Sequence, residues 1–183
     1  DVLVGGPGRL ALSARRDTGG VTLRAFEITT PGLEASAEGS VASGATRLEV
    51  AARITDVARL TDALSGPLSV AGTLGQDGAD YRLDVALEGP GGSRATVAGS
   101  YAPGANRADL DVDGRLPLAL ADAVLGGGVR LRGDLDFDLA IDGPPGIGAL
   151  SGRVSTDGTR VLLPEARLTL QDVEARADIA GGA

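Results

Sequence analysis

The sequence contains no histidine, cysteine, methionine or tryptophan, and all seventeen of its basic residues are arginine, so lysine is absent as well. Without histidine and cysteine, the usual zinc and copper ligands and the usual Cys and His nucleophiles are missing. Without lysine there is no Schiff base and no Walker-type phosphate lysine. An enzyme of this composition would have to depend on carboxylates. We therefore expect a protein that is not an enzyme and that uses no metal and no cofactor.

Aromatic residues and positive charge are also scarce. Aromatics make up 2% of the chain and the net charge is −8, which disfavours base stacking, nucleic-acid binding and charge-driven docking on an anionic membrane. The absence of cysteine fits an oxidising compartment without disulfides as well as a reducing one. The longest apolar runs fall far short of the ~18 residues that a membrane span needs. Because the sequence starts at Asp1 and not at Met, we expect a fragment of a longer protein.

The clearest positive signal is the stretch Val129–Gly143, in which apolar residues or glycine occupy every odd position and mostly charged residues the even ones. Side chains at i and i+2 share a face only in an extended strand, so this period of two predicts a strand with one apolar and one charged face. Gly133 permits a bulge or kink in this long strand. The predicted apolar positions are Leu131, Leu135, Phe137, Leu139 and Ile141, and the predicted solvent-facing ones are Arg130, Asp134, Asp136 and Asp138.

The same alternation, separated by turn signals, covers most of the chain and predicts an antiparallel meander. Near the N-terminus it places Val21, Leu23 and Ala25 on one face. Two stretches deviate, Asp56–Leu64 and Pro117–Leu125, where apolar residues at helical spacing predict short helices, the first capped by Thr55 or Asp56. The predicted fold class is therefore all-β, an elongated curled antiparallel sheet built from repeats, with two short helices.

An internal repeat supports this architecture. Ala63–Leu74 aligns without gaps to Val124–Leu135, and Tyr81–Pro90 matches Leu135–Pro144, with a loop at Gly75–Asp80 that the second copy lacks. We read 1–183 as a single fragment of a longer array, with approximate repeat units at 48–101 and 108–158. Such repeats indicate stacked units that each contact their neighbours.

Strands that are apolar on one face must hide that face, and two short helices cannot cover a dozen strands. Either two sheets close on a filled core, or one sheet curls into a trough around something else, for which an aliphatic lining suits acyl chains. The residues alone leave both readings open. If there is a trough, its candidate lining residues are Leu68, Val70, Leu74, Leu83, Val85, Leu87, Val97, Leu110, Val112, Leu131, Leu135, Phe137, Leu139 and Ile141.

The segments 56–74, 81–92, 108–145 and 150–158 together resemble the TamB family (the translocation and assembly module) and, more distantly, AsmA-like proteins. The likeness is one of repeat pattern, without a sharp catalytic motif. It implies a β-taco, which is a curled sheet with an aliphatic hydrophobic groove. It also implies a periplasmic protein of Gram-negative bacteria, anchored in the inner membrane. Such a protein moves phospholipid between the inner and outer membranes and contacts an outer-membrane assembly barrel.

Three functions of different classes remain. The first is a segment of a lipid conduit that spans the periplasm, in which phospholipid acyl chains are the partners. The second is a non-enzymatic structural or adhesive β-repeat or sandwich module with a closed core. The third is an enzyme with two carboxylates. An open, continuous aliphatic face would distinguish the first from the second, and a polar cleft with convergent carboxylates would favour the third.

Overall fold

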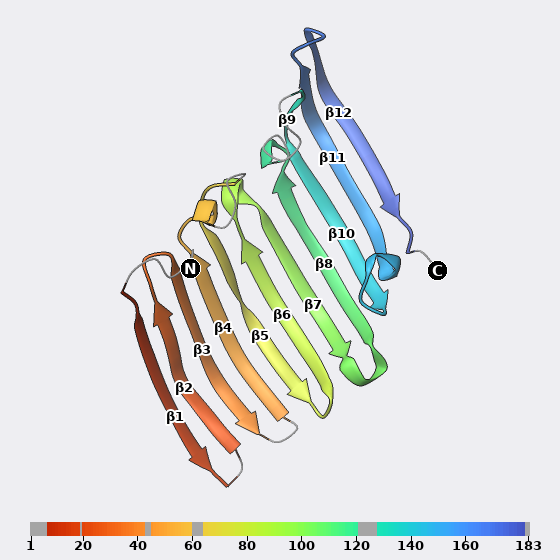
Figure 1. The fold of residues 1–183 in the computed structure, drawn as a ribbon. Helices are drawn as coiled ribbons and strands as arrows, with labels where there is room; N and C mark the ends of the chain where they lie inside the picture. The colour runs from red at the N-terminus through yellow and green to blue at the C-terminus, as the bar shows by residue number, and fades with distance from the viewer. Residues whose placement is uncertain (1–6, 19, 43–44, 60–63, 121–127, 182–183) are drawn as a thin grey trace.

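The computed structural model describes residues 7–18, 20–42, 45–59, 64–120 and 128–181. Strands make up 74% of the structure, and they form one antiparallel sheet of twelve strands that does not close into a barrel. The prediction of an all-β antiparallel fold is therefore confirmed. Figure 1 shows the strands side by side in a single layer, with β1 and β12 at opposite edges.

Strands that follow one another in the chain pair with each other, apart from β9, which pairs with β11, so that β10 pairs with β8. The first eight strands are β1 (Arg9–Asp17), β2 (Gly20–Thr29), β3 (Leu33–Ala42), β4 (Ala45–Ile54), β5 (Leu68–Asp77), β6 (Asp80–Glu88), β7 (Arg94–Ala102) and β8 (Arg107–Pro117). The remaining four are β9 (Arg130–Arg132), β10 (Asp134–Gly143), β11 (Leu150–Leu163) and β12 (Leu168–Ile179). In the part of the chain that the structure describes, single 3₁₀ turns lie between strands: η1 (Val57–Arg59), η2 (Pro90–Gly92), η3 (Pro103–Ala105) and η4 (Ile147–Ala149).

Strands β9 and β10 are the two parts of the long alternating stretch, and the break between them is the predicted kink at Gly133, where φ is 126°. The break occurs where β8 ends, because Pro117 lies opposite Asp134 and β9 continues beyond it with β11 as its partner. The Leu118 N–H donates to the carbonyl of Gly133 at 2.9 Å, which closes the end of β8 onto the kink.

The two predicted helices are not confirmed. Of Asp56–Leu64, the described part contains the single turn η1, and residues 60–63 lie outside the described residues. Of Pro117–Leu125, residues 119 and 120 are helical and 121–125 lie outside the described residues. The predicted cap at Asp56 is present: its Oδ1 accepts from the Ala58 N–H at 3.0 Å and from the Gly66 N–H at 2.8 Å, which closes the loop.

Two local predictions are wrong. In one case cross-strand pairing continues further than expected, and in the other an extra residue shifts the alternation. The predicted loop at Gly75–Asp80 reduces to residues 78 and 79, because cross-strand pairing continues through Gln76 and Tyr81. Ala25 does not share a face with Leu23, because an extra residue in β2 shifts the register there and places Ala25 opposite Ser13.

The sheet has almost no core. Among the described residues, the buried apolar side chains are Val57, Pro90 and Ala108. The accessible surface is 11783 Å², whereas the surface of a compact protein of 18.2 kDa is about 8,100 Å². Backbone pairing and contacts between neighbouring side chains within each face hold the strands together, without a second layer in the described part of the chain.

Candidate functional site

One face of the sheet is apolar across its whole length. Residues that pair directly across neighbouring strands point to the same side, so the pairing registers define rows of side chains that cross the sheet. The central row consists of Leu12, Phe26, Ala37, Val50, Gly72, Val85, Val97, Val112, Leu139, Gly152 and Ile179. This row crosses eleven strands without a polar residue.

The rows on either side of the central row are apolar as well. One consists of Leu10, Ile28, Ala35, Ala52, Val70, Leu87, Ala95, Gly114, Phe137, Val154 and Ala177. The other consists of Ala14, Leu23, Gly39, Leu48, Leu74, Leu83, Gly99, Leu110, Ile141 and Leu150. We call these three rows together the apolar face, and the opposite side the polar face.

The structure brings eleven of the fourteen predicted lining residues into these three rows. Leu68 and Leu135 lie on the same side, one row further toward the strand ends, opposite Ile54 and Leu116 respectively. Leu131 lies beyond the kink, opposite Val161 of β11. The predicted faces of the long stretch agree with its burial, except that Asp136 is half-buried.

The apolar face is half-exposed rather than enclosed. The predicted lining residues are partly buried by their neighbours in the rows, and Leu74 is 36% exposed. At the edge of the sheet the exposed fraction rises, to 63% for Leu12. In the described residues no second layer covers this face, so its aliphatic side chains are accessible to a ligand.

Glycines on the apolar face permit neighbouring strands to approach closely. A Cβ at Gly39, Gly72, Gly99, Gly114 or Gly152 would meet a backbone carbonyl of the adjacent strand. At Gly114 it would also meet the ring of Phe137, which lies directly opposite. These positions therefore require glycine for space, as expected for close backbone approach in a sheet.

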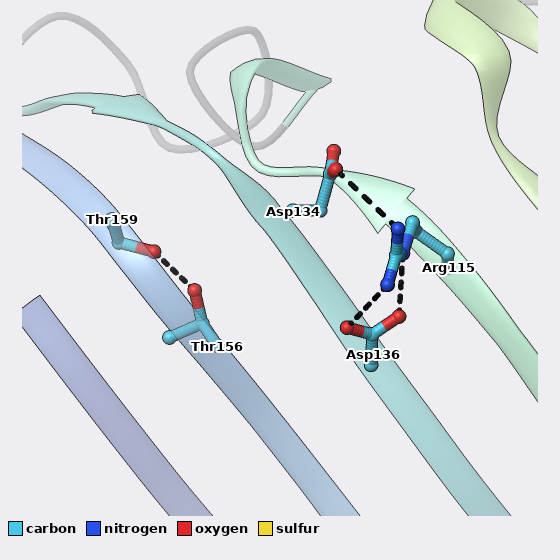
Figure 2. A network of polar contacts seen from close by, with 5 residues as sticks. All are labelled: Arg115, Asp134, Asp136, Thr156 and Thr159. Carbon is cyan, nitrogen blue, oxygen red and sulfur yellow. Dashed lines mark hydrogen bonds and ion pairs between the residues drawn. The ribbon is translucent and has the colours of Figure 1, made fainter.

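The polar face carries ion pairs that join β8 to β10 and β11 to β12. Arg115 of β8 binds Asp136 of β10 through two hydrogen bonds, Nε to Oδ1 at 2.6 Å and Nη2 to Oδ2 at 3.0 Å, and lies 4.0 Å from Asp134 (Figure 2). The hydrogen bond from Arg115 lowers the pKa of Asp136 below its ordinary value, although partial burial opposes this effect. The same bond raises the pKa of Arg115. This pairing explains why Asp136 is half-buried.

One polar spot lies beside the apolar face. The hydroxyls of Thr156 and Thr159 in β11 are hydrogen-bonded to each other (Figure 2), and Thr159 is 2% exposed. Thr156 lies opposite Leu135, and a Cβ at Gly133 would lie 3.0 Å from the hydroxyl of Thr159. The two hydroxyls satisfy each other where β11 bulges beside the kink, so they do not leave a free polar group on this side.

Shallow hollows lie along strands β2–β5. Residues of the polar face, including Glu27, Ser36, Glu49 and Thr73, line them, together with residues of the central row in one hollow and of the row of Ile28 and Val70 in the other. They are therefore depressions between rows of the polar face. A ligand on the apolar face would lie on an open surface and not in these hollows.

The predicted lining leaves out the parts of the apolar face outside residues 68–141. The alternation does place Leu48 and Val50 on one face of a strand, and the structure puts them in the apolar rows. Phe26 and Ile28 break this alternation: they are even-numbered, whereas Leu23 is odd-numbered. The extra residue in β2 places them on the same face as Leu23, which the alternation alone does not predict. In β11 the bulge between Thr156 and Thr159 hides the alternation in the same way.

No protein-family model matches the chain, and neither a curated protein nor a solved structure matches it. In the described residues no helix is both long enough and apolar enough to cross a membrane.

Proposed function

We propose that this chain is a segment of a lipid conduit, in which phospholipid acyl chains lie on the apolar face. The observation that carries the proposal is the row structure: three parallel rows of aliphatic, phenylalanine and glycine residues cross ten or eleven strands without a polar interruption, half-exposed. Contiguous apolar surface of this extent, bordered by polar residues, is typical of sites that bind lipid or another apolar partner.

The dimensions of the face suit this role. At about 4.8 Å between strands, the central row is about 48 Å long. At about 6.7 Å between rows, the three rows together with the row of Leu68 and Leu135 are about 20 Å wide. One leaflet of a bilayer core is about 15 Å thick. An extended acyl chain can therefore lie across the rows, and several lipids can lie one after another along the sheet.

The finer parts of the proposal rest on the family resemblance. In this reading the sheet curls around its apolar face into a β-taco groove, in the periplasm, as part of a longer protein anchored in the inner membrane. Phospholipid would pass along the groove between the two membranes, and other parts of that protein would contact an outer-membrane assembly barrel. The close strand approach at the glycines of the apolar face supports a curled sheet.

The runner-up, a structural or adhesive module with a closed core, requires a second layer over the apolar face. No such layer is present among the described residues, so nothing in them favours it. The carboxylates that an enzyme would need are spread along the exposed polar face, and several are held by arginines. We therefore retain the lipid conduit as the proposed function.

The first test replaces Leu139 by aspartate. Burying an unpaired carboxylate in a closed core is strongly unfavourable, whereas on an open face the carboxylate can reach water. We expect Leu139→Asp to keep its β-sheet circular dichroism and to lose bound lipid. Ala140→Asp, which puts the same charge on the polar face of the same strand, is the matched control and should keep both. Val85→Asp, in the same row as Leu139, should behave like Leu139→Asp.

The second part of the test is a photo-crosslinking probe at position 139 of the protein in cells, with a probe at Asp138 as control. Residue 139 lies on the apolar face and Asp138 is exposed on the polar face. We expect lipid adducts at 139 and none at 138. An unfolded Leu139→Asp variant, together with a probe at 139 that never captures lipid, would identify the apolar face as an ordinary core and exclude the conduit.

A further inference from the structure

The apolar face has two margins, one at each end of the strands, and their side chains differ in chemistry. We call the row that contains Leu68 and Leu135 the aliphatic margin, because its other large side chains are Leu33, Ile54 and Leu116. The polar side chains at this margin are already engaged or buried. The Thr30 hydroxyl accepts from the Leu33 N–H at 3.0 Å, Ser93 is 9% exposed, and Thr156 is hydrogen-bonded to Thr159.

At the other margin, one row beyond Leu48 and Leu83, the side chains of four consecutive strands have polar tips. In β4–β7 this row consists of Thr46, Gln76, Tyr81 and Tyr101, which we call the polar-tipped margin. All four are half-buried, and they include both tyrosines of the chain. They lie next to the turns after β3, β5 and β7, at one end of the sheet (Figure 1). Outside these strands the same row continues with Arg16, Val21, Val41, Ala108 and Gly143.

The polar-tipped margin offers hydrogen-bond donors to a ligand. The Thr46 hydroxyl donates to Oε1 of Gln76 at 3.3 Å, and Nε2 of Gln76 donates to the carbonyl of Gly78 at 3.1 Å. These bonds orient the amide of Gln76 and leave its second N–H available. Within the described residues neither tyrosine hydroxyl is hydrogen-bonded to the protein. A half-buried tyrosine has an apolar ring and a polar tip, which is why tyrosine is enriched where a membrane core meets water.

From this difference we propose that phospholipid binds the apolar face in one orientation, with its ester groups and headgroup at the polar-tipped margin and its acyl chains directed toward the aliphatic margin. This inference rests on the proposed function and adds the polarity of the bound lipid to it. Ester carbonyls and phosphate oxygens accept hydrogen bonds, which the hydroxyls of Tyr81 and Tyr101 and the amide of Gln76 can donate. In the reverse orientation the esters would lie against leucine and isoleucine side chains, where lost hydration is not replaced.

The dimensions of the face fit this orientation. The two margins are four row spacings apart, which corresponds to about 27 Å. One leaflet of a bilayer core is about 15 Å thick. An acyl chain of that length, starting at the polar-tipped margin, ends between the central row and the row of Val70 and Leu87. The headgroup then lies at the strand ends and reaches water beyond the β5–β6 turn. Tyr81 and Tyr101 are therefore positioning residues for the lipid.

Two photoreactive phosphatidylethanolamines test the orientation on the purified protein. One carries a diazirine beside the ester of an acyl chain and the other carries it at the end of the chain, and peptide mass spectrometry identifies the captured residues. We expect the ester probe to label Tyr81 and Tyr101, and the chain-end probe to label Val85 and Leu87, which lie further along β6.

The possible failures of this experiment are distinguishable. If both probes label the same residues, or if the ester probe labels Leu68 and its neighbours in the aliphatic margin, the orientation is wrong and the lipid conduit stands. If neither probe labels the apolar face, the proposed function and the orientation are both wrong.

The second test removes the two hydroxyls and keeps the two rings. The probe is diphenylhexatriene, an apolar hydrocarbon that fluoresces when bound, and phosphatidylethanolamine is added to displace it. For the double variant Tyr81→Phe, Tyr101→Phe we expect that displacement needs about tenfold more phosphatidylethanolamine, because two hydrogen bonds to the lipid are lost. Binding of diphenylhexatriene itself should not change, because it has no ester.

Ser100→Ala is the matched control, because it removes a hydroxyl from the polar face beside Tyr101 and should change neither measurement. Equal weakening of both ligands by the double variant would show that the tyrosines act only through packing, and would overturn the proposal. Unchanged displacement by phosphatidylethanolamine would overturn it as well.

Discussion

Strands β3–β7 and strands β8–β12 belong to the same sheet but achieve their register differently. From β3 to β7 every pairing register runs without a shift, and the structure describes no ion pair between these strands. Between β11 and β12 the register shifts twice, and the long strand breaks at Gly133. The ion pairs Arg107–Asp142, Arg115–Asp136 and Arg153–Asp178 lie in this second region.

The difference shows what a strict alternation can and cannot do. Between strands of nearly equal length, a slip by one residue would turn a whole apolar face to the polar side, so the pattern alone fixes the register. In the sheet, β8 ends opposite Asp134 of β10, so β9 has no partner in β8. β11 is longer than its neighbours, and its additional residues form bulges. The alternation is interrupted in this region. We infer that the cross-strand ion pairs help to fix the register there.

The largest expected effect comes from replacing a glycine in strands β3–β7, where the register has no shift. Gly99→Val places a Cβ against the carbonyl of Asp109 at a φ of +141° and should destabilise the fold by about 3 kcal/mol. Ala98→Val, one residue away on the polar face, should change stability by less than about 0.5 kcal/mol. Urea unfolding followed by circular dichroism measures both. Equal stability of the two variants would mean that close strand approach at Gly99 does not hold the sheet together.

An intermediate effect should appear in the irregular region when the ion pair is removed. The pKa of Asp136 is lowered in the folded state, so its pairing with Arg115 stabilises the fold above the unfolded pKa of about 3.8. This contribution is lost as the pH falls through the lower folded pKa. Asp136→Asn should therefore lower the melting temperature at pH 7, and the difference from wild type should shrink below pH 4. A difference that stays constant with pH would show that the charge does not contribute.

The smallest expected effect concerns a pair of like charges in strands β3 and β4. Glu38 and Glu49 lie directly opposite each other on the polar face, and like charges in this position are unfavourable. Glu49→Arg should create an opposite-charge pair and stabilise the fold by about 0.5 kcal/mol. Thermal melts at low and high salt measure it, since the gain should decline when salt screens the charges. A loss of stability would indicate that Glu49 has a role other than repulsion.

The sequence predicts most of the fold because the alternation is a local property of an extended chain. The strands, their antiparallel pairing and the faces of β10 follow from it, and the glycine in the long stretch predicts the kink at Gly133. Of the two stretches with helical spacing, the structure describes the turn η1 in the first and helical residues 119 and 120 in the second. The opposite parity of Phe26 could not be predicted, because a bulge depends on the partner strand.

The candidate site was predictable in its residues but not in its environment. Eleven predicted residues fall into three rows because directly paired residues share a face. Whether a second sheet covers those rows depends on contacts between distant segments, which the alternation does not encode. The internal repeat illustrates the same limit, since the matched strands β6 and β10 run in opposite directions across the sheet.

The central claim is that the apolar face is an open surface that holds acyl chains, and native mass spectrometry of the protein purified from a Gram-negative bacterium tests it most directly. We expect mass adducts that correspond to phospholipid on the wild-type chain and on Ala140→Asp. Leu139→Asp and Val85→Asp should lose these adducts and keep the fold. A folded wild-type chain that carries no phospholipid, or adducts that survive both substitutions on the apolar face, would contradict it.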